Sequence, residues 1–138
     1  MSSQAAAASR RLQRKTSAGA RILLVEDNAR VRVPLVDLLQ AWGYDVESAG
    51  DGFEALGKAA QFHPDVVVSD LRMPRLNGAQ LIRELRTRNP GLKFILYSGQ
   101  RPEEQDLMSL EGICFLQKPF DPARLREQIE KCLSELLP

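Results

Sequence analysis

Five residues whose types could do chemistry together fall directly after short apolar runs of the sequence. They comprise three acids, a hydroxyl and an amine: Glu26, Asp27, Asp70, Ser98 and Lys118. Three carboxylates brought close repel one another, so they stay together where a cation neutralises them. A set of oxygen ligands suits a hard divalent ion, Mg²⁺ first. These acids therefore predict a magnesium site if the fold brings them to one place.

The same residues suit phosphoryl transfer. A divalent ion beside a carboxylate can orient an incoming phosphoryl group and offset its charge. A carboxylate that attacks phosphorus forms an acyl phosphate. Lys118 supplies a second positive partner for phosphoryl oxygens, and Ser98 can donate a hydrogen bond to one of them. The residue types thus point to an aspartyl-phosphate site.

The elements that must position these residues alternate along the chain. Short apolar or β-branched runs predict five strands: Arg21–Val25, Tyr44–Ser48, Asp65–Ser69, Leu92–Tyr97 and Ile113–Gln117. Helical spacing of apolar residues predicts five helices: 29–42, from Asp51 to Pro64, from Gly78 onward, a short one from Pro102 to near Gly112, and one from Pro122 onward.

Strict alternation predicts a parallel sheet with helices on both faces, because each crossover is right-handed and runs over one face. Five units are too few for a closed eight-unit barrel. The predicted fold class is therefore α/β, with an open doubly wound sheet. Ligands of such sheets bind beyond the carboxyl ends of the strands, which is where the five polar residues fall.

Some finer features also follow from the pattern. Glu54 follows the expected N-cap Asp51 by three residues, as in a capping box, and the inner stripe of that helix is expected to be Phe53, Leu56 and Ala60. The two cysteines, Cys114 and Cys132, lie in apolar patterns. They are expected to be buried thiols rather than a disulfide or metal pair, which suits a reducing cytosol.

The composition is that of one globular domain. The chain has 138 residues, 43% hydrophobic and 27% charged, with no apolar run near the roughly 18 residues of a membrane span. Residues 1–21 carry five bases and no acid, which leaves 14 bases against 18 acids in the rest. A nucleic-acid groove is therefore not expected. Residues 1–20 are interpreted as a flexible basic leader, with an organelle transit peptide as the alternative.

Four segments around the polar residues resemble the response-regulator receiver family of two-component signalling. They match in order and with similar spacing: Leu24–Asn28, Ser69–Pro74 with Asn77–Gly78, Tyr97–Gly99, and Phe115–Phe120. The resemblance runs from Arg21 to about Leu137 and implies a receiver domain over 21–138. It also implies a flavodoxin-like strand order of 2-1-3-4-5 with five helices.

The resemblance implies the ligands of the site. Asp70 would be the phosphoacceptor. The Mg²⁺ ion would be held by Glu26, Asp27, Asp70 and the backbone carbonyl of Arg72, whose side chain is free to vary.

The resemblance also implies a switch. Lys118 would pair with the phosphoryl oxygens, aimed by a cis bond to Pro119. Ser98 would move toward the phosphoryl group, and Phe115 would turn inward behind it. Serine stands where threonine is common, and Phe115 replaces a frequent tyrosine that could form a phenolic hydrogen bond.

The implied function is a cytoplasmic phosphoacceptor switch rather than a conventional enzyme. A histidine kinase or histidine phosphotransfer domain would supply the phosphoryl group, and an unidentified downstream protein would bind the changed surface. A homodimer through the face of the fourth helix, fifth strand and fifth helix is possible. Some likeness to receivers of hybrid histidine kinases leaves two forms open, a stand-alone receiver and a fragment of a larger protein.

Other functions fit the residues less well. A phosphatase of the haloacid-dehalogenase type would want an acid two residues after its nucleophile, where this chain has Arg72. A flavodoxin-type protein would need a Ser-, Thr- or Gly-rich loop after the first strand to hold phosphate. Here that loop begins with Glu26 and Asp27, which would repel it. A degenerate receiver is disfavoured because all five site positions carry suitable residues.

Overall fold

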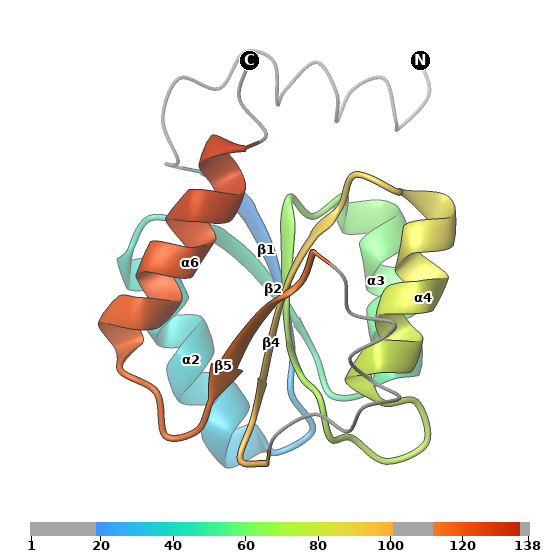
Figure 1. The fold of residues 1–138 in the computed structure, drawn as a ribbon, viewed down its shortest axis with the longest axis horizontal. Helices are drawn as coiled ribbons and strands as arrows, with labels where there is room; N and C mark the ends of the chain where they lie inside the picture. The colour runs from blue at the N-terminus through green and yellow to red at the C-terminus, as the bar shows by residue number, and fades with distance from the viewer. Residues whose placement is uncertain (1–18, 101–111, 136–138) are drawn as a thin grey trace.

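The computed structural model describes residues 19–100 and 112–135 (Figure 1). Within these ranges it contains five strands and four helices: β1 Arg21–Val25, α2 Ala29–Ala41, β2 Asp45–Ala49, α3 Gly52–Phe62, β3 Val66–Asp70, α4 Gly78–Arg88, β4 Lys93–Ser98, β5 Cys114–Gln117 and α6 Pro122–Ser134. The short helix predicted from Pro102 to near Gly112, and nearly all of the predicted leader, lie outside the described residues. No helix in the described part is long and apolar enough to cross a membrane.

The five strands form one parallel sheet in the order β2-β1-β3-β4-β5, which confirms the predicted doubly wound topology. The chain moves outward from β1 to β2, then crosses back to β3 on the other side of β1. The order therefore reverses between β1 and β3. Their register places Val25 beside Ser69, so the residues that follow β1 lie next to the end of β3.

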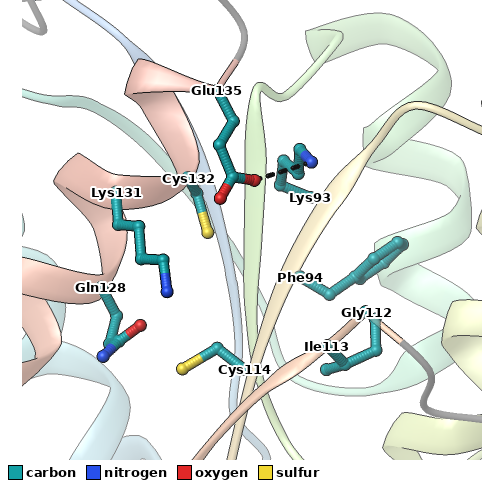
Figure 2. Close-up of a pocket in the computed structure, with 9 residues that line it drawn as sticks. All are labelled: Lys93, Phe94, Gly112, Ile113, Cys114, Gln128, Lys131, Cys132 and Glu135. Carbon is teal, nitrogen blue, oxygen red and sulfur yellow. Dashed lines mark ion pairs between the residues drawn. The ribbon is translucent and has the colours of Figure 1, made fainter.

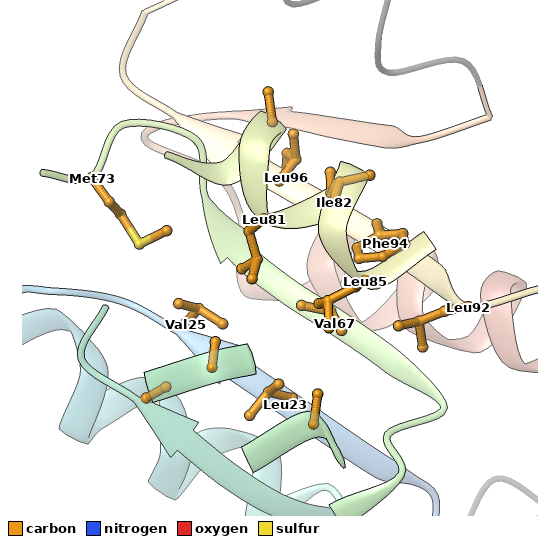
Figure 3. Packing of buried hydrophobic residues seen from close by; sticks show 14 of the residues in the cluster. Leu23, Val25, Val67, Met73, Leu81, Ile82, Leu85, Leu92, Phe94 and Leu96 are labelled. Carbon is orange, nitrogen blue, oxygen red and sulfur yellow. The ribbon is translucent and has the colours of Figure 1, made fainter. Parts of the chain in front are cut away.

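Two layers of helices enclose the sheet. Figure 1 shows α2 and α6 on one face and α3 and α4 on the other. Alternate residues of the central strands supply the two cores: Leu23, Val25 and Val67 face α3 and α4, whereas Ile22, Leu24 and Val66 belong to the opposite core. Figure 3 shows the first of these cores, with side chains of α4 packed over the sheet. Every residue of β3 is buried, as its consecutive apolar pattern predicted.

The predicted inner stripe of α3 was wrong at two of its three positions: Leu56 packs against the core as predicted, but Phe53 and Ala60 do not face it. The buried residues are Gly52, Ala55 and Ala59, whereas the side chain of Phe53 is 57% exposed and Ala60 is also exposed. Small residues face inward because the helix lies very close to its neighbours. A Cβ atom added to Gly52 would lie 2.7 Å from the side chain of Leu76, so glycine is needed there.

The predicted helix caps are present, and one hydrogen bond at the start of α3 differs from the prediction. Asp51 accepts a hydrogen bond from the Glu54 N–H at 2.8 Å, as predicted, but the Glu54 carboxylate accepts from the Gly50 N–H rather than that of Asp51. The second hydrogen bond of the expected capping box is therefore made to the residue before the N-cap instead of to the N-cap itself. Asp121 caps α6 and Pro122 opens it, as predicted.

Both cysteines are free thiols, in agreement with the sequence analysis. Cys132 is buried in α6, and Cys114 is half-buried at the start of β5. Burial raises the pKa of Cys132 to about 11. The thiol therefore stays protonated near neutral pH, as a buried apolar residue would require.

Candidate acidic site at the carboxyl edge of the sheet

The three acids singled out in the sequence meet at the point where the strand order reverses. Glu26 and Asp27 follow β1, and Asp70 ends β3. One carboxylate oxygen from each lies within 4.8 Å of the other two. Glu26 and Asp70 are buried, whereas Asp27 is exposed. This set of hard oxygen donors fits a divalent cation, because carboxylates so close together are stable when a cation offsets their charge.

The loop that carries Glu26 is held from three sides. Its backbone N–H donates to the Ala49 carbonyl at 3.0 Å, and Arg32 of α2 donates to its carbonyl at 2.7 Å. One carboxylate oxygen, Oε2, accepts from the backbone N–H of Asn28 at 3.1 Å. Burial raises the pKa of Glu26, and hydrogen bonds to its carboxylate oppose that rise. A bound cation would favour the ionised form further.

Asp70 is fixed by the turn that follows β3. Its Oδ1 atom accepts a hydrogen bond from the backbone N–H of Arg72 at 3.0 Å. The chain then returns so closely that a Cβ atom on Gly78 would lie 2.8 Å from the Asp70 carbonyl oxygen. Glycine at the start of α4 is therefore part of what positions Asp70.

Lys118 reaches both buried acids from the end of β5. Its Nζ atom lies 3.5 Å from Asp70 Oδ2 and 3.7 Å from Glu26 Oε1. The peptide bond to Pro119 is cis, as the sequence suggested. The lysine side chain is one-third exposed, so its ammonium group stands between the buried carboxylates and solvent.

Ser98 ends β4 at the same edge and is buried. Its carbonyl accepts a hydrogen bond from the Lys118 backbone N–H at 2.8 Å, and its Oγ atom accepts from the Gln100 N–H at 3.2 Å. Phe115 belongs to the neighbouring strand β5 rather than to the strand ends that carry the acids. It sits inside β5, half-buried against the core that faces α4.

Sequence reasoning missed one residue that contacts the site. Tyr97 was placed at the end of a strand and in a segment that resembles the family, but was given no role of its own, yet its hydroxyl donates to Glu26 Oε1 at 2.9 Å. The ring also lies beneath the Lys118 ammonium, 4.8 Å from its centroid. The available signal was its place in the sheet, because Tyr97 is the register partner of Asp70 and a buried tyrosine hydroxyl needs a partner.

A separate cavity of about 420 Å³ lies between β4, β5 and α6 (Figure 2). Its rim includes the ion pair between Lys93 and Glu135, at 2.9 Å. Lys93 begins β4, whereas Ser98 ends it, so the cavity lies toward the opposite end of the strand from the acidic cluster. It contributes nothing to the chemistry of the acids.

The fold and the acidic cluster together define a class: a doubly wound α/β domain with three carboxylates and a lysine at its switch point. Comparison with known proteins agrees with this class. Residues 22–130 match the family model described as the response regulator receiver domain. The chain therefore belongs to the response-regulator receiver family of two-component systems.

Individual relatives show how widely the domain is shared. The chain is 35% identical to the chemotaxis protein CheY of Thermotoga maritima over 116 residues, covering 82% of this chain and 97% of CheY. It is 38% identical to the sensor kinase CckA of Brucella abortus over 123 residues, covering 86% of this chain but 13% of CckA. The solved receiver domain of the hybrid histidine kinase CckA superimposes with a TM-score of 0.70 at 34% identity, covering 83% of this chain and 99% of that domain.

Proposed function

We propose that this chain is a phosphoacceptor switch in which Asp70 takes a phosphoryl group from a histidine kinase or a histidine phosphotransfer domain. The observation that carries the proposal is the position of the Asp70 carboxylate. It lies within 4.8 Å of the carboxylates of Glu26 and Asp27, and 3.5 Å from the Lys118 ammonium. A carboxylate surrounded in this way can approach an anionic phosphoryl group when a cation is bound.

The transfer is a substitution at phosphorus. A carboxylate oxygen of Asp70 forms a new P–O bond while the P–N bond of the phosphohistidine breaks, and the imidazole leaves with the bonding pair. Mg²⁺, held by Glu26, Asp27, Asp70 and the backbone carbonyl of Arg72, would offset the charge between these carboxylates and the phosphoryl oxygens. Hydrolysis by water breaks the acyl phosphate, releases inorganic phosphate and returns the free carboxylate of Asp70.

Lys118 and Ser98 bind the phosphoryl oxygens. The Lys118 ammonium, already 3.5 Å from Asp70 Oδ2, pairs with one oxygen. The Ser98 hydroxyl accepts from the Gln100 N–H and retains its own proton, which it can donate to another oxygen. Because the Lys118 N–H bonds the Ser98 carbonyl, a shift at the end of β4 moves the end of β5 with it.

The switch is a population shift between two arrangements of β4 and β5, biased by contacts to the phosphoryl group. Phe115 lies in β5 only three residues before Lys118, half-buried at the border of the core. Inward rotation of its ring behind Ser98 changes the surface offered to a downstream protein. The proposed place for partner or homodimer contacts is the predicted face of the fourth helix, fifth strand and fifth helix, of which β5 and α6 lie within the described residues.

The proposed setting follows from the family. Receivers of two-component systems pair with histidine kinases, and the likeness to CckA supports a hybrid kinase or its phosphotransfer partner as the donor. We propose a cytoplasmic receiver domain over 21–138. The protein acts as a switch and assists its own phosphorylation and dephosphorylation, rather than turning over a separate substrate.

The test is the intact mass of the protein after incubation with acetyl phosphate, with Mg²⁺ or with EDTA. We expect the wild type to gain one phosphoryl group with Mg²⁺, and Asp70→Asn to gain none. Asp65→Asn is a matched control, because Asp65 is equally buried but lies just before the amino end of β3. A wild type that stays unmodified, or an Asp70→Asn protein that still gains the group, would overturn the proposal.

A further inference from the structure

We propose that Tyr97 is a positioning residue that holds Glu26 in its metal-binding orientation and divides Lys118 between the two buried acids. The inference rests on the proposed function and adds a residue to its machinery. Tyr97 is fully buried at the end of β4, one residue before Ser98 and level with Asp70 in the sheet. It contacts the acidic cluster with both its hydroxyl and its ring.

The Tyr97 hydroxyl holds one carboxylate oxygen of Glu26 by a hydrogen bond. Glu26 Oε1 accepts from Tyr97 at 2.9 Å and lies 3.7 Å from Lys118, while Oε2 accepts from the Asn28 N–H at 3.1 Å. The carboxylate is thus held at both oxygens in one orientation. Burial raises the pKa of Tyr97, so the hydroxyl keeps its proton and acts as a donor at neutral pH. Hydrogen bonds of this kind orient metal ligands and preserve their affinity.

The Tyr97 ring contacts the ammonium group of Lys118. The Lys118 ammonium lies 4.8 Å from the centroid of Tyr97, within the range of a cation–π contact. Without the hydroxyl, the charge on Glu26 Oε1 would be shared with Lys118 alone. The ammonium would then be drawn toward Glu26 and away from Asp70 Oδ2, which is 3.5 Å away. The hydroxyl and the ring therefore have separable effects on the site.

A purely structural tyrosine would behave differently, and the chain contains a matched example. Tyr44 is also buried, and its hydroxyl also donates to a carboxylate, that of Glu130 in α6. It lies just before the amino end of β2 and has no contact with the acidic cluster. Replacing either tyrosine by phenylalanine preserves the ring and removes one hydrogen bond to a carboxylate. The acceptor of Tyr44 is exposed, whereas that of Tyr97 is buried, so Tyr44→Phe controls for the loss of a tyrosine–carboxylate hydrogen bond away from the acidic cluster.

The experiment measures the affinity for Mn²⁺, a spin probe for the magnesium site, by counting free ion with electron paramagnetic resonance. We expect Tyr97→Phe to bind Mn²⁺ about tenfold more weakly, the low end of the roughly 10- to 100-fold loss typical when an outer hydrogen bond to a metal ligand is removed, because Glu26 keeps its other hydrogen bond, from the Asn28 N–H. Tyr44→Phe should bind as the wild type does. In a Glu26→Ala background, Tyr97→Phe should have no further effect on Mn²⁺ affinity, because the carboxylate through which the hydroxyl acts has been removed.

A second variant separates the ring from the hydroxyl. Tyr97→Leu should weaken Mn²⁺ binding as Tyr97→Phe does, and should slow phosphorylation by acetyl phosphate beyond the loss seen in Tyr97→Phe at saturating metal. Urea unfolding of each variant shows whether it is folded under the assay conditions. Equal Mn²⁺ affinity in the wild type and a folded Tyr97→Phe would overturn the inference, as would an undiminished effect in the Glu26→Ala background.

The outcomes also distinguish this inference from the function beneath it. If the wild type bound Mn²⁺ and was phosphorylated on Asp70, and Tyr97→Phe equalled it in both respects, only the proposed role of Tyr97 would be refuted. A wild type that neither binds Mn²⁺ nor gains a phosphoryl group would remove the proposed function, and this inference with it.

Discussion

Lys118 offers the sharpest test of the electrostatics, because its removal should weaken the fold and yet strengthen cation binding. Its ammonium is 3.5 Å from Asp70 and 3.7 Å from Glu26, whose side chains are 11% and 1% exposed. Lys118→Ala would leave two buried carboxylates without their positive partner. A divalent cation would then meet less competition for the same oxygens.

The magnitude follows from the distances. At an effective dielectric constant of about 20, each pair has a Coulomb energy on the order of 4 to 5 kcal/mol. Breaking a fully buried pair costs about 3 to 5 kcal/mol. Because the side chain of Lys118 is 33% exposed, solvent screening reduces the effect. We expect the metal-free variant to lose about 2 kcal/mol of unfolding free energy.

Lys58 provides the matched control. It also bridges two carboxylates, at 3.7 Å from Glu47 and 3.3 Å from Glu54, but both acids are about half exposed. Surface pairs of this kind contribute roughly 0 to 1 kcal/mol. Lys58→Ala should therefore change stability little, and its response to Mg²⁺ should match that of the wild type.

The assay is urea unfolding at neutral pH and fixed ionic strength, in EDTA and in saturating Mg²⁺. In EDTA, Lys118→Ala should be less stable than the wild type, and Mg²⁺ should stabilise the variant by more than it stabilises the wild type. If Mg²⁺ stabilised the variant less, or if Lys118→Ala and Lys58→Ala behaved alike in EDTA, the electrostatic account of the site would be refuted.

Three further predictions concern the residues around the acids. Gly78→Ala should cost about 2 kcal/mol of unfolding free energy in urea, because its Cβ would press on the Asp70 carbonyl at 2.8 Å; an unchanged midpoint would contradict this. Ser98→Ala should abolish the phosphorylation-dependent NMR shifts at Phe115, and Ser98→Thr should retain them; shifts that persist in Ser98→Ala would disprove the coupling. Burial raises the pKa of Glu26, so the folded protein holds that proton more tightly than the unfolded chain does. In EDTA the wild type should therefore lose stability relative to Glu26→Gln as pH rises from the ordinary glutamate pKa through the raised value. A difference in unfolding free energy between the two proteins that did not change with pH would refute this prediction.

The convergence of the acids could be predicted from sequence because it follows from sheet geometry alone. Each polar residue was placed at the end of a strand, and parallel strands end at one edge. An error of one residue in a strand boundary does not move a residue to another edge. The strand that begins at Asp45, expected from Tyr44, shows this tolerance.

Contacts that depend on the direction of a side chain could not be predicted from the spacing of apolar residues. In α3 the inner face could be assigned to Phe53 or to Ala55, two positions apart, and apolar periodicity favoured the larger side chain. The structure instead turns the small residues Gly52, Ala55 and Ala59 inward, with Gly52 packed closely against Leu76, and leaves Phe53 exposed. Tyr97 was missed for a related reason, since its hydroxyl finds Glu26 across two strand pairings that no local pattern encodes.

The burial of the strands suggests why a charge on Asp70 would be felt at the edge of the sheet. The acids lie at the ends of β1 and β3, whose residues are buried almost throughout and packed from both faces. Close-packed strands of this kind resist displacement. Lys118 follows β5, an edge strand with a single buried residue, Leu116, and is tied to the Ser98 carbonyl by one backbone hydrogen bond. The other edge strand, β2, also has one buried residue, but it does not carry the lysine that contacts the acids. We therefore expect a change at the acids to be accommodated in β5, the strand that contains Phe115.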